Sequence, residues 1–291
     1  MHTALFELCR RYADAHADRH GVAVTPVPGL TIVRALYPGE LQAAIARPLI
    51  AMLLQGRKRV TTGIESFEYG PGEAMVIAAD VPTTSQITEA SHRHPYYSLV
   101  LELDIAMLRE LQEVVPAEQG KMSCVGIEPM NADVTDAAYR LARLFERPAA
   151  MAILGEGLRR ELHYWLLQSV HGAAIRALGV VDSHTDKISR AVAILRQDFM
   201  RPISVEELAD AAGMSVSAFH RHFRAITTIS PLQFQKQLRL IHARRLMLAD
   251  GTGIAQAAYT VGYASVPQFT REYARLFGAP PGRDRRAVTE G

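Results

Sequence analysis

Short apolar runs alternate with turn residues between residues 31 and 103. The runs cover residues 31–36, 49–54, 74–77 and 97–103. The segments between them contain Pro38-Gly39, Gln55-Gly56, Tyr69-Gly70-Pro71-Gly72 and Asp80-Val81-Pro82. Short apolar runs bounded by Gly and Pro are typical of β-strands joined by tight turns. The pattern predicts a small antiparallel barrel or sandwich with a hollow interior.

The periodicity becomes helical from Asn131 to Leu178. One apolar face consists of Ala137, Leu141, Leu144 and Phe145, and a second face, after Pro148, consists of Ile153, Leu158, Leu162, Leu166 and Val170. This spacing predicts two helices in a hairpin. Their apolar excess leaves open whether they pack on the β-domain or on a second subunit. Residues 180–186 form a short polar linker, so the N-terminal domain is expected to span residues 1–180.

Residues 203–224 predict a helix, a tight turn and a second helix. Ser204 and Glu207 have the spacing of a reciprocal capping box, and Ser215 would cap the second helix. Gly213 permits the positive φ that the turn requires. The apolar seam is Leu208, Ala212, Met214, Phe219 and Phe223, and the opposite face carries Ser217, Ala218, His220, Arg221 and Arg224. Such a unit places its second helix in a major groove of DNA.

The same pattern returns from Gly253 to Gly278. Gly262 corresponds to Gly213, Ser265 is expected to cap like Ser215, and Pro267 suits the first turn of a helix. Residues 231–249 predict one long helix between the copies. Such a spacer would hold two reading helices about one DNA turn, roughly 34 Å, apart. We therefore expect residues 187–286 to form an all-α domain with two helix-turn-helix units.

The net charge of +2 conceals an asymmetry along the chain. Residues 186–286 carry 15 Lys and Arg against 8 Asp and Glu, a net charge of +7, whereas residues 1–185 have a net charge of −4. A basic domain favours a polyanionic partner, because its cations replace counterions on phosphate. The expected partner is double-stranded DNA.

Arg221 and Arg271 occupy equivalent positions in the two copies and are the expected base readers. A guanidinium at such a position donates two hydrogen bonds to guanine O6 and N7. Weaker candidates on the same faces are Ser217, His220 and Gln268. Four further cations are as consistent with phosphate contacts as with solvated charge: Arg224, Lys236, Arg239 and Arg275.

The last third of the chain resembles the AraC/XylS family of transcription regulators. The motifs that carry the resemblance are Leu208-Ala209, Gly213-Met214-Ser215, Phe219, Phe223, Pro231, Gly262-Tyr263, Ser265, Gln268-Phe269, Arg271, Phe277-Gly278 and Pro280-Pro281. The resemblance implies seven helices, with groove-reading positions at Ser217, His220 and Arg221, then at Val266, Pro267, Gln268 and Arg271. Val266 and Pro267 donate no side-chain hydrogen bond, so the second unit is expected to read sequence more weakly. Gly282-Arg283-Asp284 replaces the aromatic-Arg ending of many members.

The front half is similar to the N-terminal domain of one subgroup of that family. The matching segments are residues 47–49, 54–58, 69–73 and 81–84. This resemblance implies a cupin-like barrel that binds an effector or mediates dimerisation. We thus expect an α+β chain, with a cupin-like β-barrel and helical hairpin followed by the all-α domain. It would act as a homodimer controlled by a small molecule or partner protein, and RNA polymerase stays open as a further partner.

A cupin-type metalloenzyme with a nucleic-acid-binding appendage is the competing class. Cupin enzymes hold a metal with a His-x-His pair, a Glu and a later His. In the front half such a pair occurs only as His92-Arg93-His94, and the position after Gly56 reads Arg57-Lys58-Arg59, whose cations would repel a metal. A Gly-rich phosphate loop and a nucleophile motif are missing from the sequence. We expect no catalytic residue, metal or cofactor. A protein-interaction scaffold is a third class, which sequence-dependent DNA binding would exclude.

The sequence also bears on cellular location. It contains no apolar stretch of the length that a membrane helix needs, and residues 1–20 lack the apolar region of a secretory signal. Cys9 and Cys124 are too few for a disulfide framework and are interpreted as small apolar fillers. We expect a cytoplasmic bacterial protein without a membrane partner.

Overall fold

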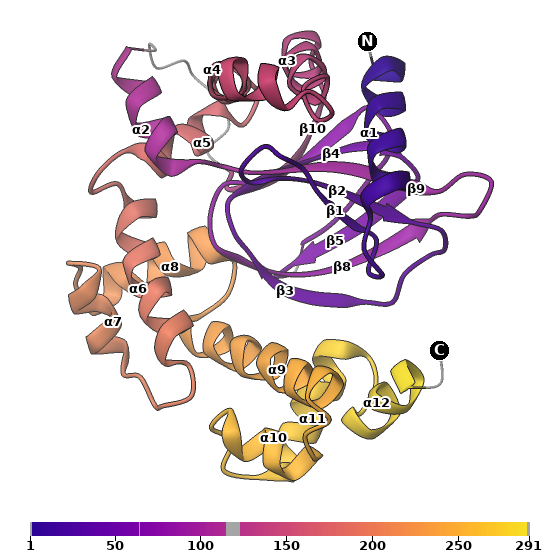
Figure 1. Ribbon diagram of the computed structural model, residues 1–291. Coiled ribbons are helices and arrows are strands. Elements are labelled where there is room, and N and C mark those ends of the chain that lie inside the picture. The colour runs from indigo at the N-terminus through magenta and orange to yellow at the C-terminus, as the bar shows by residue number, and fades with distance from the viewer. Residues whose placement is uncertain (1, 64, 115–122, 290–291) are drawn as a thin grey trace.

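The computed structural model describes residues 2–63, 65–114 and 123–289, in which a β-rich part is followed by helices (Figure 1). The strands are β1 (Val22–Val24), β2 (Leu30–Ala35), β3 (Gln42–Ala46), β4 (Leu49–Gln55), β5 (Arg57–Thr62), β6 (Glu65–Tyr69), β7 (Glu73–Ile77), β8 (Val81–Glu89), β9 (Tyr96–Glu102) and β10 (Val125–Pro129). The helices are α1 (His2–His16), α2 (Ile105–Val114), α3 (Ala132–Ala142), α4 (Pro148–Leu167), α5 (Gly172–Gly179), α6 (His184–Asp198), α7 (Val205–Ala211), α8 (Val216–Thr227), α9 (Pro231–Ala249), α10 (Ile254–Thr260), α11 (Val266–Phe277) and α12 (Pro281–Thr289).

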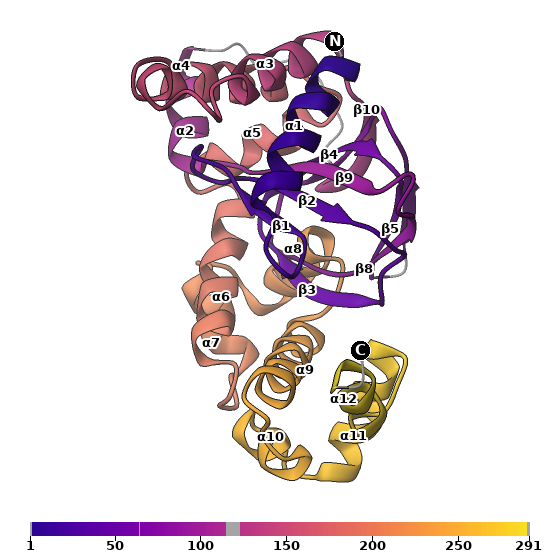
Figure 2. The same ribbon diagram turned by 45° about the vertical axis from the view of Figure 1, so that its right-hand side comes forward.

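The described strands form two antiparallel sheets, in the orders β1-β2-β9-β4-β7-β10 and β3-β8-β5-β6. The four runs predicted as strands are confirmed as β2, β4, β7 and β9. The strand pattern left a barrel or a sandwich open, and the cupin-like barrel that the resemblance implies is not closed, because among the described residues no edge strand of one sheet pairs with the other sheet. The edge strand β3 instead lies against α9 and α11, as Figure 1 and Figure 2 show from two sides.

The larger sheet is buried on both faces. Along β4, Ile50, Met52 and Leu54 face α1 to α5, whereas Ala51 and Leu53 face the smaller sheet. This explains why β4 reads as a continuous apolar run rather than an alternating one. The predicted hollow interior is wrong too, since buried side chains, among them the fully buried Tyr69 and Tyr96, fill the space between the sheets.

Helices cover the outer face of the larger sheet. The predicted hairpin is confirmed as α3 and α4, which pack on each other, and a third helix, α5, follows it. The side chain of Asn131 caps α3 by accepting a hydrogen bond from the amide of Val134 at 2.7 Å, and Pro148 lies in the first turn of α4. Leu162 and Leu166 pack into the core beside the sheet, but Ile153, assigned to the same face, is 82% exposed.

His163 joins α4 to the start of α2. Its side chain is fully buried; Nδ1 donates to the carbonyl of Arg159 at 2.8 Å, and Nε2 accepts from the amide of Asp104 at 3.0 Å. These two bonds require a neutral ring protonated on Nδ1. Burial lowers the pKa of His163, and the charge of Arg159 lowers it further.

Acidification is expected to destabilise the fold through His163. Since its pKa is lower in the folded state than in the unfolded chain, its contribution is complete above about pH 6.5 and is lost as the pH falls below that value. The midpoint of thermal unfolding should fall by several degrees between about pH 7.5 and about pH 5.5, and should fall less in His163→Gln. The exposed His20 supplies the control, His20→Gln, which should follow the wild type. Equal pH dependence in the wild type and His163→Gln would contradict the assignment.

The two helix-turn-helix units differ in how they attach to the β-rich part. Phe219 and Phe223 of α8 belong to the apolar cluster that also contains Leu53 and Val60 between the sheets. The second unit has a separate core around Phe269. The first unit is therefore continuous with the sandwich, whereas the second unit has its own core and contacts the β-rich part at β3. Among the described residues, no helix is both long and apolar enough to cross a membrane.

Candidate nucleic-acid interface

The first unit consists of α7, a turn at Gly213 and α8. Gly213 has φ +61°, as predicted for the turn. The hydroxyl of Ser204 accepts from the amide of Glu207 at 3.1 Å, and that of Ser215 accepts from the amide of Ala218 at 3.4 Å, which confirms both caps. Of the predicted apolar seam, Met214 is partly buried, and the other members are buried: Leu208, Ala212, Phe219 and Phe223.

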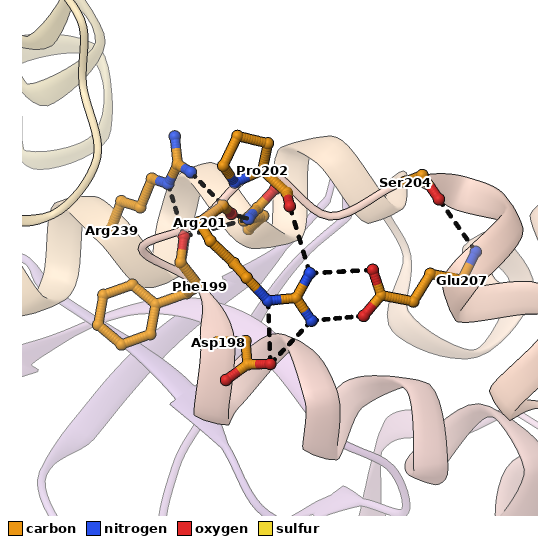
Figure 3. A network of polar contacts seen from close by, with 8 residues as sticks. Asp198, Phe199, Arg201, Pro202, Ser204, Glu207 and Arg239 are labelled. Carbon is orange, nitrogen blue, oxygen red and sulfur yellow. Dashed lines mark hydrogen bonds and ion pairs between the residues drawn. The ribbon is translucent and has the colours of Figure 1, made fainter.

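The predicted return bond of the capping box is wrong. The carboxylate of Glu207 does not bond to the amide of Ser204; it accepts two hydrogen bonds from Arg201, one of them between Nη1 and Oε2 at 2.9 Å (Figure 3). Arg201 also contacts Asp198, with 2.8 Å between Nη2 and Oδ2. A bidentate bond to a guanidinium is stronger than a single bond to an amide, so Arg201 holds Glu207. The hydrogen bonds from Arg201 lower the pKa of Glu207.

The second unit repeats this geometry with one exception. Gly262 has φ +88°, and Pro267 lies in the first turn of α11. Ser265 occupies the N-cap position, but its side chain makes no capping hydrogen bond, so this expectation is wrong. The physical reason lies in Pro267, which removes one of the two amide donors that a capping serine can bind.

The strongest reading candidates are exposed on the two second helices. Ser217, His220 and Arg221 are exposed on α8, and Arg271 is exposed on α11. Arg221 has one side-chain contact among the described residues, 3.3 Å from its Nη2 to Nε2 of His222. Both guanidinium groups are therefore accessible to a macromolecule.

The other site candidates lie in different surroundings. Gln268 is partly buried and donates to Oε1 of Glu272 at 3.2 Å. Arg224 lines a cleft of about 320 Å³ beside β6, and Arg275 lines a cleft of about 510 Å³ between α11 and the smaller sheet. The structure thus separates Arg224 and Arg275, which border the β-rich part, from the freely exposed Arg221 and Arg271. Of the positions that the resemblance adds, Val266 is partly buried and Pro267 is exposed.

Lys236 and Arg239 on α9 are engaged within the protein. Nζ of Lys236 pairs with Oε1 of Glu272 at 2.7 Å. Arg239 donates from Nε to the carbonyl of Phe199 at 2.7 Å and from Nη1 to that of Gly262 at 2.9 Å. Its Nη2 donates to the carbonyls of Met200 and Arg201 at 3.1 and 3.2 Å; Figure 3 shows how the side chain lies beside residues 199–201. Neither cation is free to bind phosphate in this arrangement.

These bonds fix the two units relative to each other. Gln235, one turn before Arg239, donates to the carbonyls of Phe199 and Arg201 at 3.1 and 2.7 Å. Gly262 approaches the same loop so closely that a Cβ there would lie 2.1 Å from the carbonyl oxygen of Met200. The segment between α6 and α7 is therefore tied both to the spacer and to the turn of the second unit. Sequence reasoning missed this connection.

The C-terminal helix is held by a second network that the sequence did not predict. Nε and Nη2 of Arg244 contact the two oxygens of Asp284 at 2.8 and 3.0 Å, and the hydroxyl of Tyr273 donates to Oδ2 at 2.5 Å. Burial raises the pKa of Asp284, but the bonds from Arg244 and Tyr273 outweigh it and hold the pKa below its usual value. Asp284, where the chain departs from the ending of many family members, thus anchors α12 to α9 and α11.

The histidines considered for a metal lie apart from other ligands. His92 and His94 are exposed in the loop between β8 and β9, where His92 hydrogen-bonds to Tyr37. Within residues 2–63, 65–114 and 123–289, no three His, Cys, Asp or Glu side chains form a group that could hold a metal ion. Cys9 is fully buried in the apolar core, as expected of a filler, and burial raises its pKa to about 12.

Known transcriptional regulators resemble part of this chain in sequence. It is 32% identical over 112 residues to the HTH-type transcriptional regulator GbdR of Pseudomonas aeruginosa, a match that covers 38% of this chain and 30% of GbdR. It is 28% identical over 151 residues to an AraC-like transcription regulator of Streptomyces lividans, covering 50% of this chain and 49% of that protein. The chain thus spans less than two thirds of the length of these relatives.

A solved structure shares the whole fold. The crystal structure of ToxT from Vibrio cholerae with a bound unsaturated fatty acid superposes with a TM-score of 0.56 at 10% identity, over 89% of this chain and 96% of ToxT. Residues 208–287 match the model of a helix-turn-helix domain, and residues 26–174, more than half of the chain, match the model of the AraC-type transcriptional regulator N-terminus. With both halves matched in this order, the chain belongs to the AraC family of transcriptional regulators.

Proposed function

We propose that this chain is a sequence-specific transcription regulator of the AraC/XylS type that binds double-stranded DNA in the cytoplasm. The observation that carries the proposal is the pair of helix-turn-helix units with Arg221 and Arg271 exposed at equivalent positions. Residues 187–286 bind DNA, and residues 1–180 bind an effector and mediate dimerisation. The net charge of +7 in the C-terminal part supplies the attraction to phosphate.

The contacts divide by position on the two reading helices. Arg221 and Arg271 read bases, with Ser217 and His220 beside Arg221. Gln268 contributes only if it leaves Glu272, to which it donates at 3.2 Å. Arg224 and Arg275 lie further along their helices, each beside a cleft that it lines, and contact phosphate when DNA is bound.

The N-terminal part supplies the control. A small molecule or partner protein there favours one arrangement of the regulator by binding it more tightly than the other. ToxT, which has the same fold, was crystallised with a fatty acid, and this supports a small molecule as the controlling partner. The exposed apolar side chains Ile153 and Leu154 of α4 support a homodimer, since water contact with them is unfavourable. RNA polymerase remains a further partner in transcription.

Selection among DNA fragments tests the proposal. The full chain is mixed with fragments from upstream of its own and neighbouring genes over a salt series, with size-exclusion mass measurement of the complex. One fragment should be retained at salt that releases the others, because base contacts add to the phosphate term. A chain that selects no fragment at any salt, with or without candidate ligands, would overturn the proposal.

Catalysis is the alternative, and we propose that the chain has none. Its named relatives are transcriptional regulators. The cupin-type metalloenzyme would require a metal at His92 and His94, which lie exposed in a loop. A stoichiometric transition metal in the purified protein that is lost on His92→Ala and His94→Ala would favour the enzyme instead.

A further inference from the structure

A cleft of about 320 Å³ lies between α1, α3 and the turn that leads from α3 to α4. The two helices pack side by side, as Figure 2 shows. Tyr12 and Phe145 line the cleft from the apolar core, with ring centroids 5.1 Å apart, and the partly buried Leu8 and Tyr139 line it nearer the surface. Sites for small organic molecules have volumes from about 300 Å³ upward. None of the lining residues belongs to the DNA-binding part, so this cleft is separate from the reading helices.

The turn after α3 directs two arginines away from the core. The amide of Phe145 donates to the carbonyl of Ala142 at 3.2 Å, which continues the helical path past the end of α3. The amide of Arg147 donates to the carbonyl of Leu144 at 2.9 Å. Leu144 and Phe145 are buried, whereas Arg143 and Arg147 are exposed. Residues four apart on a helical path lie on the same side, and both arginines line the cleft.

Arg143 and Arg147 carry uncompensated charge. Neither guanidinium forms an ion pair or a hydrogen bond with the residues that the structure describes; that of Arg143 lies 6.0 Å from the ring centre of Tyr139. The third arginine of the lining, Arg11, is paired with Glu146 at 3.1 Å. The lining therefore holds three positive charges and one negative charge, and two positive charges are left over.

The carboxylates of the neighbouring helices do not neutralise these two charges. Both carboxylates of α1, Glu7 and Asp14, form ion pairs with other arginines, at 2.8 and 2.9 Å. On α3, Asp136 pairs with Arg140 at 2.8 Å, and Asp133 lies in the first turn, at the opposite end of the helix from the cleft. An anion from outside the chain would therefore complete the site.

The number and shape of the donors favour a phosphate group. A phosphate monoester carries a charge of about −2 at neutral pH, which matches the two uncompensated guanidinium groups, whereas a single carboxylate would neutralise one of them. Its three free oxygens can accept the paired hydrogen bonds of both guanidinium groups. The accessible surface of Leu8 and Tyr139 beside the arginines favours an apolar or aromatic organic portion.

We propose that this cleft binds a small organic phosphate. Arg143 and Arg147 hold its phosphate group, and its organic portion lies against Leu8 and Tyr139. Arg11 is a positioning residue, because it holds the carboxylate of Glu146, which would otherwise repel the ligand. The ligand binds whether or not DNA is present, since the cleft shares no residue with the reading helices.

Phenyl phosphate is the probe, and calorimetry measures its binding to the full chain without DNA at about pH 7.5, where the phosphate is almost fully dianionic. In the double variant Arg143→Gln with Arg147→Gln, its affinity should fall about tenfold or more, because both charge-assisted contacts are lost. The fold should tolerate the change, since both side chains are exposed and that of Arg147 makes no capping hydrogen bond to α4. Glu146→Gln, which removes the carboxylate of the lining, should raise the affinity.

The matched control is Arg93→Gln. Arg93 is an exposed arginine in the loop between β8 and β9, outside the cleft lining, and its loss should change the affinity by no more than about twofold because distant surface charges are screened. Phenyl sulfate, which has one charge fewer, and inorganic phosphate, which has no ring, should both bind the wild type more weakly than phenyl phosphate.

Three results would overturn the proposal. The first is that phenyl phosphate does not bind the wild type, or binds the double variant as tightly as Arg93→Gln. The second is that Glu146→Gln weakens binding. The third is that the double variant keeps phenyl phosphate but loses affinity for all DNA fragments, which would make the two arginines contacts to the DNA backbone. The selection of one fragment by the wild type is untouched by any of these results, so failure here is distinguishable from failure of the proposed function.

Discussion

Replacing Arg221 and Arg271 together with alanine is expected to abolish selection of the preferred DNA fragment while weak, salt-sensitive binding to all DNA persists. Each arginine that donates two hydrogen bonds to a guanine contributes roughly 1 to 3 kcal/mol of discrimination. Loss of both should therefore lower the preference for the selected fragment roughly 30-fold or more. Phosphate contacts elsewhere on the basic domain remain, so unselective binding survives.

The fold should tolerate this change. Both side chains are exposed, and the contact of Arg221 with His222 is a single weak one at 3.3 Å. The matched control is Arg245→Ala with Arg283→Ala, which removes the same charge from α9 and α12, outside both reading helices. The control should weaken binding to all fragments alike and keep the preference. If the control loses the preference as fully as the Arg221 and Arg271 variant, charge rather than base reading explains selection.

Local signals predicted the C-terminal part well. The spacer was expected at residues 231–249 and is observed as Pro231–Ala249. Pro231 at its start and the apolar and polar residues along it are sequence-local features. Gly213 and Gly262 marked the turns for the same reason, because a positive φ is a property of one residue. Where structure depends on neighbours in sequence, the prediction succeeded.

The β-rich part was harder to predict because its strands depend on long-range packing. Residues 57–59 were interpreted as cations that would repel a metal, yet they belong to β5, in which Val60 and Thr62 are buried and Arg59 is exposed. One apolar residue among cations gives too weak an alternation to identify an edge or half-buried strand from sequence. Whether two sheets close into a barrel is likewise decided by strand partners, which no local pattern encodes.

The candidate site was predicted in part. Whether each predicted residue touches DNA stays a prediction, but the sequence located the second helix of each unit and the exposed Arg221 and Arg271. It gave no sign that Arg239 binds the carbonyls of residues 199–201 and of Gly262. Every residue has a backbone carbonyl, so the sequence does not indicate which carbonyls an arginine side chain will bind. These hydrogen bonds between the two units can be identified only in the three-dimensional structure.

Gly262→Ala is expected to cost far more stability than Gly213→Ala, although the two glycines occupy equivalent turns. Gly213 has φ +61°, and a Cβ added there would have no atom within 4 Å, so alanine adds only backbone strain of about 1 to 2 kcal/mol. At Gly262, with φ +88°, the added Cβ would lie 2.1 Å from the carbonyl oxygen of Met200. The loop must move, and crowding adds about 1 to 3 kcal/mol to the strain. Thermal or denaturant unfolding of both variants measures the difference.

The same pair of variants tests whether the contacts of Gly262 and Arg239 with residues 199–201 set the spacing between α8 and α11. Arg239 donates to the carbonyl of Gly262 at 2.9 Å and to that of Met200 at 3.1 Å. If the loop at Met200 moves away from Gly262, the arginine can no longer bind both carbonyls. The second unit then loses its fixed orientation, while the first keeps its core, which is shared with the β-sandwich. The protected region in a footprint of Gly262→Ala should shorten to the half read by α8, whereas Gly213→Ala should protect both halves. Equal stability losses and equal footprints would mean that the contact between Met200 and Gly262 does not control the spacing, and that α9 alone is rigid enough to hold the two units.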